Sequence, residues 1–341
     1  MAILRVGFFG AGLIATSHAA GLERAGVAHE LVGVYDPDTE RRDAFAERWQ
    51  VPPCDTEAEV FDRSDAVYVC TWTSEHARLV DEACRRGLAV FCEKPLAFDA
   101  AAAMAMADAV EAAEVVNQVG LVLRYSPAFR LLADLVADPA AGRVMSVTFR
   151  DDQYIPVQGM YASSWRGDRT KAGSGTLLEH SIHDVDILEH CIGPVASVSA
   201  HSANFHGLDG IEDAVATVVQ FESGAVGVHT TIWHDVLERP SLRRVEVFCE
   251  RRHIVVENDV LGPMRWQTTG EAEVVVEGDA LLAVVAERGL AAGRNQDRAF
   301  LHAVAAGALA SPSFADAVRA HRVVDAIYAS AGAGGAPTAV G

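Results

Sequence analysis

Basic residues, paired cysteines and long apolar runs are scarce in this sequence, and each scarcity argues against a class of protein. The 341 residues include 28 lysines and arginines against 47 aspartates and glutamates, a formal net charge of −19. That excess disfavours nucleic acid or an anionic membrane surface as the main partner. The six cysteines form no C-x-x-C pair, so we expect buried thiols in a reducing compartment instead of disulfides or metal ligands.

Signals for membrane insertion or export are also missing from the sequence. No uninterrupted apolar stretch is long enough to cross a bilayer. Three glycines break the apolar N-terminus, whose period is that of a strand followed by a helix, and this argues against a signal peptide. We therefore expect a cytoplasmic protein with no membrane partner. Half of the residues are hydrophobic, and the length suggests two domains, each with its own core.

The first half of the chain is organised around the N-terminal stretch LRVGFFGAGLIA, which has the order strand, glycine turn, helix start. Gly10 permits the tight turn, Gly12 leaves no Cβ where a pyrophosphate would approach, and Ala15 lets the helix pack on the strand. A second apolar run ends in Asp36, near the ~20-residue offset of an acid that binds a ribose. An ordinary glycine turn is the alternative, but this context favours a dinucleotide site. The predicted cofactor contacts here are Gly10, Ala11, Gly12, Leu13, Ile14 and Asp36.

Strands and helices alternate up to about residue 123. Further strands are expected at 66–71, 88–92 and 115–119, and helices at 37–50, from Ser74 or Glu75 to near Gly87, and at 99–113. This alternation predicts a parallel, doubly wound (Rossmann) sheet with right-handed crossovers over residues 1–123.

Strand-like runs dominate the second half, after one more helix at 127–136. They lie at 144–149, 196–203, 214–221, 225–233, 243–249, 253–256 and 273–276. One helix is expected inside this region, at 176–191, and two at its end, at 295–306 and 314–331. The pattern predicts an α+β domain over residues 124–331 with a large, mostly antiparallel open sheet. Its last helix is free to pack back on the first domain, and the glycine-rich residues 332–341 are expected to be flexible.

Lys94 follows a predicted strand of the parallel sheet, at the edge where such sheets bind ligands. Pro95 restricts the backbone of this lysine. Its ammonium group could hydrogen-bond a substrate hydroxyl and favour the alkoxide that develops as a hydride leaves. A solvated surface lysine is the alternative, and the neighbouring Glu93 is equally ambiguous.

The helix expected at 176–191 carries a second set of polar residues. Glu179, His183, Asp186 and His190 lie at i, i+4, i+7 and i+11, so we expect them on one face. An acid and a histidine on a helix that is anchored by an apolar stripe suit general acid–base chemistry, because histidine exchanges protons near neutral pH. A solvated polar face is the alternative. A metal site of Glu179, His180 and His183 is a weaker third hypothesis, since no familiar metal-binding motif is complete.

The segments GFFGAGLIA, CTWTSEHARLV, CEKPLA and GSGTLLEHSIHDVDIL together resemble the glucose–fructose oxidoreductase, inositol dehydrogenase and MocA (Gfo/Idh/MocA) family. The resemblance continues to the closing FADAVRAHRVVDAIYAS and so covers nearly the whole chain. It implies a nicotinamide-dependent dehydrogenase or reductase that acts on a sugar, cyclitol or similar polyol. It also implies that Lys94 and His183 flank the reacting carbinol, with His183 as the usual acid/base.

The same resemblance extends the predicted site. Further cofactor contacts are expected from Thr71, Trp72, His76, Glu93, Lys94, Trp165 and Arg166. Substrate contacts are expected from Lys94, Arg124, Glu179, His180 and His183, and the catalytic residues from Lys94, His183 and Glu179; no metal is expected.

The sequence departs from the family four residues before the histidine, where Glu179 replaces the usual aspartate, and the usual small residue two before it is Ser181. The extra methylene of Glu179 would carry its carboxylate about 1.5 Å further into the pocket. The reaction class is unaffected by this change, but the usual polyol substrate becomes uncertain.

The leading hypothesis is hydride transfer between NAD and a secondary alcohol or ketone of a sugar, cyclitol or related polyol. A redox-neutral NAD-dependent glycosidase, with Tyr125 or Tyr154 as an added base, and a non-catalytic NAD(P)-binding sensor are the alternatives. Asp36 favours NAD over NADP, because it would repel a 2′-phosphate, although the pair Arg41-Arg42 is a counter-signal. We also expect a homo-oligomer that forms through the C-terminal sheet.

Overall fold

The computed structural model describes residues 3–159, 161–290 and 295–341. The chain divides into two compact units. Unit 1 comprises Met1–Leu121 and Asn295–Val318, and unit 2 comprises Val122–Arg294 and Arg319–Gly341. The segment Asn295–Val318, which the sequence pattern places in the second domain, therefore belongs with the first, because its apolar side chains complete the core of unit 1.

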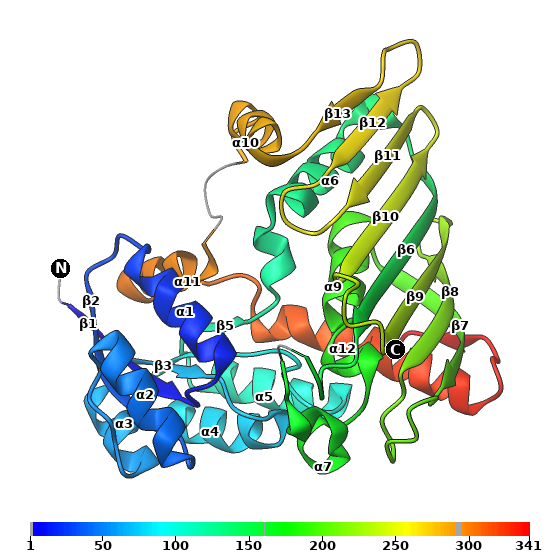
Figure 1. Cartoon of the computed structure of the whole chain (residues 1–341). Helices are drawn as coiled ribbons and strands as arrows, with labels where there is room; N and C mark the ends of the chain where they lie inside the picture. Colours follow the sequence, from blue (N-terminus) through cyan, green and yellow to red (C-terminus); the bar gives the residue numbers. More distant parts are fainter. Residues whose placement is uncertain (1–2, 160, 291–294) are drawn as a thin grey trace. The chain divides into compact units, whose positions relative to one another are not determined.

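Unit 1 contains a five-stranded parallel sheet in the order β2-β1-β3-β4-β5 (Figure 1). The strands are β1 (Leu4–Phe9), β2 (His29–Tyr35), β3 (Ala66–Val69), β4 (Ala89–Cys92) and β5 (Asn117–Val119). The helices are α1 (Leu13–Glu23), α2 (Thr39–Trp49), α3 (Glu57–Arg63), α4 (Thr73–Arg85), α5 (Ala100–Ala112) and α11 (Gln296–Ala306). α1 packs beside α11, and α4 packs beside α5. The doubly wound architecture is confirmed; only the short α3 has no counterpart in the predicted elements.

Each face of this sheet has its own apolar core. Along β3, Ala66 and Tyr68 belong to one buried cluster, whereas Val67 and Val69 belong to the other. Successive side chains of a strand point to opposite faces, so both faces of the central strand are buried. The first cluster also contains Phe300 of α11, whose ring meets that of Tyr68 edge-on. This contact explains why α11 folds with unit 1.

Unit 2 contains a nine-stranded sheet in the order β13-β12-β11-β10-β6-β9-β8-β7-β14. All neighbouring pairs are antiparallel except β6 and β9. The strands are β6 (Val144–Tyr154), β7 (Val195–Ala203), β8 (Ala214–Phe221), β9 (Val226–His234), β10 (Leu242–Cys249), β11 (Arg252–Glu257), β12 (Met264–Thr268), β13 (Val274–Val276) and β14 (Thr338–Ala339). The predicted large, mostly antiparallel sheet is confirmed.

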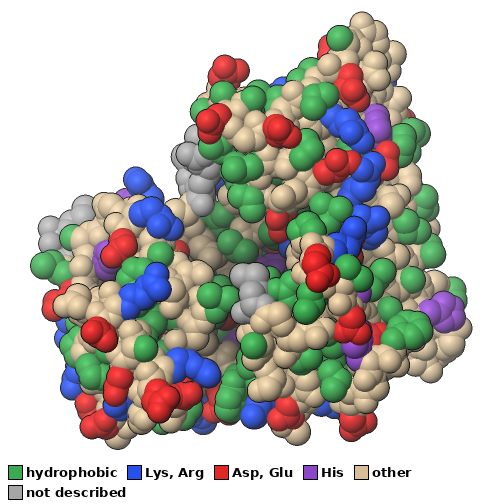
Figure 2. Space-filling view, viewed as in Figure 1, with side chains coloured by type: hydrophobic (Ala, Val, Ile, Leu, Met, Phe, Trp, Pro, Cys, Tyr) green, Lys and Arg blue, Asp and Glu red, His purple; other side chains and the backbone are tan. Residues whose placement is uncertain are grey.

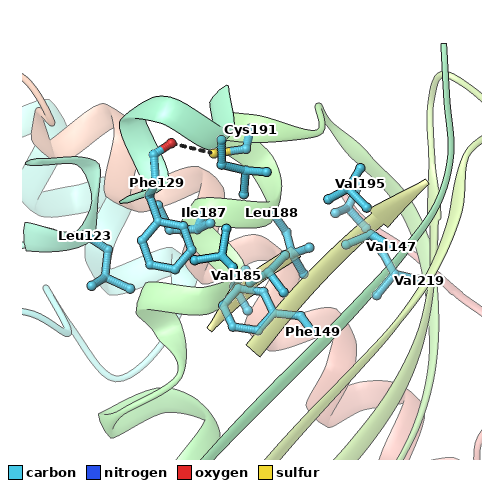
Figure 3. Packing of buried hydrophobic residues seen from close by; sticks show 14 of the residues in the cluster. Leu123, Phe129, Val147, Phe149, Val185, Ile187, Leu188, Cys191, Val195 and Val219 are labelled. Atoms are coloured by element: carbon cyan, nitrogen blue, oxygen red, sulfur yellow. Dashed lines mark hydrogen bonds between the residues drawn. The ribbon is translucent and has the colours of Figure 1, made fainter. Parts of the chain in front are cut away.

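Helices cover one face of this sheet. They are α6 (Pro127–Ala137), α8 (Thr176–Glu179), α9 (Ile182–Cys191), α10 (Gly278–Glu287) and α12 (Phe314–Gly332). Unit 2 also contains the short helix α7 (Arg169–Ala172) and 3₁₀ turns at Val122–Tyr125, Pro139–Ala141 and Ser164–Gly167. Val185 and Leu188 of α9 pack with Phe129 of α6 and with Val147 and Phe149 of β6 (Figure 3). The apolar stripe of α9 therefore fixes the polar residues on the same helix.

The single helix expected at 176–191 is interrupted between α8 and α9, and that prediction is wrong. The amide of Ser181 donates to the carbonyl of Thr176 at 2.9 Å, five residues back. The hydroxyl of Ser181 bonds to Asp151 at 3.0 Å and to Thr231. A side chain that bonds to the neighbouring strands offers the backbone an alternative to the regular ladder, so Glu179 and His183 do not share one continuous helix.

Two further differences concern the end of the chain. β12 and α10 were not expected from the sequence. The tail that was expected to be flexible contains β14, whose residues pair with Val198 and Ser197 of β7.

No helix among the described residues is long and apolar enough to span a bilayer. Acidic and basic side chains are intermixed on the face of each unit that Figure 2 shows.

Candidate active site

The glycine turn of unit 1 has the geometry of a nucleotide-binding turn. Gly10 has φ of +89°, and a Cβ at this position would collide with the carbonyl oxygen of Cys70. Only glycine fits this combination of dihedral angle and close approach. A Cβ on Gly12 would meet no atom within 4 Å in the described chain, so the space over Gly12 is open.

The N-terminus of α1 opens onto the same space. Gly12 is its N-cap residue, and no described side chain caps it. The first N–H groups of a helix have no intrahelical partner and, with the helix dipole, favour an anion. Leu13 is 62% exposed and Ile14 is 41% exposed, so both side chains are accessible to a ligand bound at the start of α1. These features fit the pyrophosphate of a dinucleotide.

Asp36 ties the end of β2 to the glycine turn. Its carboxylate accepts hydrogen bonds from the amide of Ala11 at 2.8 Å and from the amide of Asp38 at 2.9 Å. The side chain is buried, so its orientation is fixed. A carboxylate at this position can accept hydrogen bonds from ribose hydroxyls.

Arg41 and Arg42, the two arginines that would favour NADP, have acidic partners. The guanidinium of Arg42 contacts Asp43 and Asp55, each at 2.8 Å, and lies largely buried. Arg41 lies 3.5 Å from Asp38. Both guanidinium groups thus have a carboxylate partner, which weakens the argument for NADP.

His76, expected to contact the cofactor, is instead buried against backbone. Its Nδ1 lies 3.0 Å from the carbonyl of Pro95 and 3.3 Å from that of Leu96, and its Nε2 lies 3.4 Å from the carbonyl of Thr71. Burial lowers the pKa of His76 below its usual value, despite these hydrogen bonds. The ring therefore links the loop after β3 to the segment that follows Lys94. Trp72 is the N-cap residue of α4.

Lys94 is the second residue after the end of β4, as predicted. Its amide donates to the carboxylate of its neighbour Glu93 at 3.3 Å. Glu93 is buried, and its second oxygen lies 2.9 Å from Nε2 of His18. On the other side of the ring, Nδ1 lies 2.6 Å from Asp297. His18 and Asp297 were missed by the sequence argument. The only signal was a histidine at the spacing of the apolar residues of α1.

The surroundings of His18 favour its protonated form. Burial by itself lowers the pKa of the ring, but the hydrogen bonds and charges of Asp297 and Glu93 outweigh it and raise the pKa to about 9. Because both ring nitrogens face carboxylate oxygens, both must donate, and only the imidazolium has two N–H groups.

The predicted site residues of unit 2 gather around α8 and α9. Glu179 ends α8 and is buried, and Nε of Arg166 donates to it at 2.7 Å. The guanidinium of Arg166 also lies over the rings of Trp165 and Tyr161, with distances to the ring centroids of 4.9 and 5.8 Å. The expected Trp-Arg pair is therefore joined to Glu179.

His180 lies between a carboxylate and a guanidinium. Its Nε2 is 2.9 Å from Asp151 and 2.9 Å from Nη2 of Arg243. An unprotonated Nε2 accepts from Arg243, whereas a protonated Nε2 donates to Asp151. Burial raises the pKa of Asp151, but the opposing charges of His180 and Arg243 prevail and lower it. This histidine is held in place from two sides.

His183 lies in the first turn of α9 and is 7% exposed. The residue after it, Asp184, accepts from Nε of Arg243 at 2.7 Å and lies 3.2 Å from His229. One turn further on, Asp186 forms a bidentate pair with Arg124, at 2.9 and 2.6 Å. Arg124, expected to contact substrate, is thus bound to the helix that carries His183.

No group of three or more His, Cys, Asp or Glu side chains among the described residues is arranged to hold a metal ion. All six cysteines are free thiols.

Two family models match successive parts of the chain. The oxidoreductase family with an NAD-binding Rossmann fold matches residues 4–121, and the Gfo/Idh/MocA C-terminal domain matches residues 129–255. The chain belongs to the Gfo/Idh/MocA family. It is accordingly an NAD-binding oxidoreductase, and unit 1 supplies the nucleotide-binding turn.

Several curated relatives within the family act on cyclic polyols or sugar derivatives by name. The chain is 34% identical over 228 residues to 1,5-anhydro-D-fructose reductase of Ensifer adhaerens, covering 65% of this chain and 67% of the relative. It is 28% identical over 347 residues to inositol 2-dehydrogenase of Rhizobium meliloti, covering 96% of each.

Solved structures of the family share the fold over the whole chain. An oxidoreductase domain protein from Kribbella flavida matches with a TM-score of 0.87 and 25% identity, covering 100% of both chains. Levoglucosan dehydrogenase in complex with NADH matches with a TM-score of 0.87 and 22% identity, again over 100% of both chains. At that identity, the second likeness shows the fold alone.

Proposed function

We propose that this protein oxidises a secondary alcohol of a sugar, cyclitol or related polyol with NAD, or reduces the corresponding ketone. Lys94 and His183 handle the proton in this reaction. The observation that carries the proposal is the placement of Lys94 at the carboxyl end of a parallel strand, with its backbone fixed by Glu93, in an NAD-binding unit. The names of the curated relatives support the substrate class.

Bound NAD supplies the hydride acceptor. The ammonium group of Lys94 donates a hydrogen bond to the reacting oxygen and stabilises the negative charge that builds there. A neutral His183 accepts the hydroxyl proton, and its burial on α9 limits how far the imidazole can turn. In the reductive direction, the imidazolium of His183 returns that proton.

The cofactor is held by the first unit. Gly10, Gly12 and the start of α1 take the pyrophosphate, and Asp36 takes the adenosine ribose. NAD is preferred over NADP, because the carboxylate of Asp36 repels a 2′-phosphate and Arg42 is bound by acidic partners. A higher kcat/KM with NADP would contradict this assignment.

The substrate contacts come from Glu179, His180 and Arg124, together with the catalytic pair. Glu179 is longer than the aspartate typical of the family, and Arg166 holds its carboxylate. This departure from the family concerns the choice of polyol substrate, while the reaction class stays the same.

A panel of sugars, inositols and their glycosides, followed at 340 nm with NAD and with NADP, tests this proposal. Lys94→Ala and His183→Ala should each lower turnover by about 10²–10⁴-fold. Matched controls are Lys171→Ala, which removes the other lysine of the chain, and His190→Ala, at the exposed end of α9. Both controls should retain activity. Release of an aglycone without net NADH would replace the dehydrogenase with a redox-neutral glycosidase, and near-normal turnover in either catalytic variant would refute the assigned roles.

The protein is also proposed to be cytoplasmic and homo-oligomeric. Its six free thiols suit a reducing compartment. On the uncovered face of the large sheet, Val218 and Val228 form an exposed cross-strand pair, with Val226 and Ile232 exposed nearby. Light scattering of the wild type and of Val228→Glu tests this surface, because a charge in an apolar interface should shift the mass toward the monomer.

A further inference from the structure

Unit 1 contains a buried row of ionisable groups that the hydride-transfer mechanism does not use. Glu93, His18 and Asp297 are 7%, 1% and 4% exposed. They come from the end of β4, from α1 and from the first turn of α11. The distances along the row are 2.9 Å and 2.6 Å, so each link is a charge-assisted hydrogen bond.

Aromatic side chains shield the row from solvent. The ring of His18 packs against Phe91 and Tyr68, with centroid distances of 4.7 and 5.2 Å. Burying charged groups is costly unless they are paired and hydrogen-bonded. A single imidazolium that serves two carboxylates meets this requirement for Glu93 and Asp297 together.

Two glycines make room for the carboxylates at the ends of the row. A Cβ on Gly120 would collide with the carboxylate of Glu93, and a Cβ on Gly21 would collide with that of Asp297. Neither glycine has a positive φ, so backbone conformation does not require glycine at either position. The space that the two carboxylates need explains why both positions are glycine.

The row joins the two parts of unit 1 that the proposed reaction needs. The carboxylate oxygen of Glu93 that does not contact His18 accepts a hydrogen bond from the amide of Lys94 at 3.3 Å. His18 lies on α1, six residues after its N-cap residue Gly12, at the helix start that is proposed to receive the pyrophosphate. A shift of the row would therefore move both the lysine and the helix that receives the pyrophosphate.

We propose that His18 and Asp297 are positioning residues for Lys94, fixing Glu93 and thereby the lysine backbone relative to the nucleotide-binding helix. The inference rests on the function proposed for Lys94. A catalytic group must be held within a fraction of an ångström by the groups behind it, and misplacement by 1 Å can cost about 10²-fold in rate.

The experiment uses two variants, Asp297→Asn and His18→Gln. Each removes the charge of the side chain without adding bulk. Either should lower kcat/KM by about ten-fold or more, and kcat should carry most of that loss. Phe45→Leu is the matched control, since Phe45 packs on Phe8 in the same unit, away from the row. It should cost stability while leaving kcat unchanged.

A direct observation of the lysine separates positioning from a purely structural role. Lys94 and Lys171 are the two lysines of the chain, so ε-¹³C-lysine labelling gives two side-chain NMR signals. In both variants the Lys94 signal should shift or broaden, whereas the Lys171 signal should stay in place as an internal reference. Loss of stability with an unchanged Lys94 signal and unchanged kcat would overturn the proposal.

The Lys94 NMR signal also distinguishes failure of the positioning proposal from failure of the proposed reaction. If no substrate in the panel is turned over but the Lys94 signal moves in the variants, the positioning stands and the proposed reaction fails. Should the variants not fold, ¹⁵N signals of the His18 ring in the wild type decide the matter. Two ring N–H groups at pH 7.5 support the row, and a neutral ring overturns it.

Discussion

Each unit buries carboxylates around one cation, but the cation is a histidine in unit 1 and an arginine in unit 2. In unit 1, His18 bridges Glu93 and Asp297. In unit 2, Arg243 contacts Asp184 and Asp259 at 2.7 Å each and Asp151 at 3.3 Å. Each network includes the sequence neighbour of a predicted catalytic residue, Glu93 before Lys94 and Asp184 after His183.

The difference between the cations decides how each network responds to pH. An arginine remains charged across the whole range in which proteins are stable; burial opposes its charge, but the surrounding carboxylates raise the pKa of Arg243 further. His18, with a pKa raised to about 9, can lose its proton while the protein is still folded. The cation of the unit 2 network is therefore permanently charged, whereas the cation of the unit 1 network can be titrated.

The largest effect is expected from Arg243→Met, which removes the permanent cation. Asp151 and Asp184 would then lie buried without their main counter-charge, and breaking a buried ion pair from one side costs about 3–5 kcal/mol. Chemical denaturation measures this loss of unfolding free energy. Arg239→Met is the matched control, because Arg239 also bonds an aspartate at 2.6 Å but is 42% exposed; it should change stability little. Equal losses in the two variants would contradict the role of burial.

The next effect is a pH dependence carried by His18. Its pKa is raised from 6.5 to about 9, so its stabilisation is complete below pH 6.5, declines as the pH rises, and is lost above about 9. The full change is about 3 kcal/mol of unfolding free energy. Denaturation at a series of pH values should show this decline in the wild type and not in His18→Gln.

The comparison with His18→Gln separates the titration of His18 from that of the ionisable groups near its ring. The ionisable side chains that face it or its partners are Glu93, Asp297, Tyr68, Cys70 and Cys92. Burial raises the pKa of the Cys70 and Cys92 thiols well above the usual value. A slope that persists in His18→Gln would show that another group carries the pH dependence.

Neither network could be predicted from the sequence, although the parallel sheet and the large, mostly antiparallel sheet could. The alternation of strands and helices and the apolar stripe of α9 are local patterns, and the structure confirms them. His18 and Asp297 are 279 residues apart and His18 and Glu93 are 75 apart, and no local pattern connects residues so distant. A histidine in an apolar stripe was the one available clue.

The break between α8 and α9 was unpredictable for the same reason. Ser181 leaves the helix because its hydroxyl bonds to Asp151 and Thr231, which lie 30 and 50 residues away. Periodicity alone predicts one continuous helix there. α10 was missed because the run around Leu281 and Val285 is apolar on most sides, which does not distinguish a helix from a strand.

A smaller effect is expected at Glu179, whose cation Arg166 is partly exposed instead of buried. Glu179→Asp would withdraw the carboxylate by about 1.5 Å from Nε of Arg166 and leave a polar group poorly paired, at about 1–3 kcal/mol in kcat/KM. If Glu179 contacts substrate, Gln and Ala should lose more than Asp. Equal kcat/KM for Asp, Gln, Ala and the wild type would remove Glu179 from the site.

The smallest effect tests a carboxylate that has no cation among its described contacts. Glu212 accepts hydrogen bonds from the amides of Gly175 and Leu177 at the start of α8 and from the hydroxyl of Tyr328 at 2.9 Å. Tyr328→Phe removes one neutral donor and the acceptor of the Leu178 amide, so the unfolding free energy should fall by only about 1 kcal/mol. Desolvation and the charge of Glu212 raise the pKa of Tyr328 well above its usual value. The loss should therefore be the same at pH 6.5 and at pH 9, in contrast to His18→Gln, and a loss that varies with pH would mean that a charged group takes part in this cap.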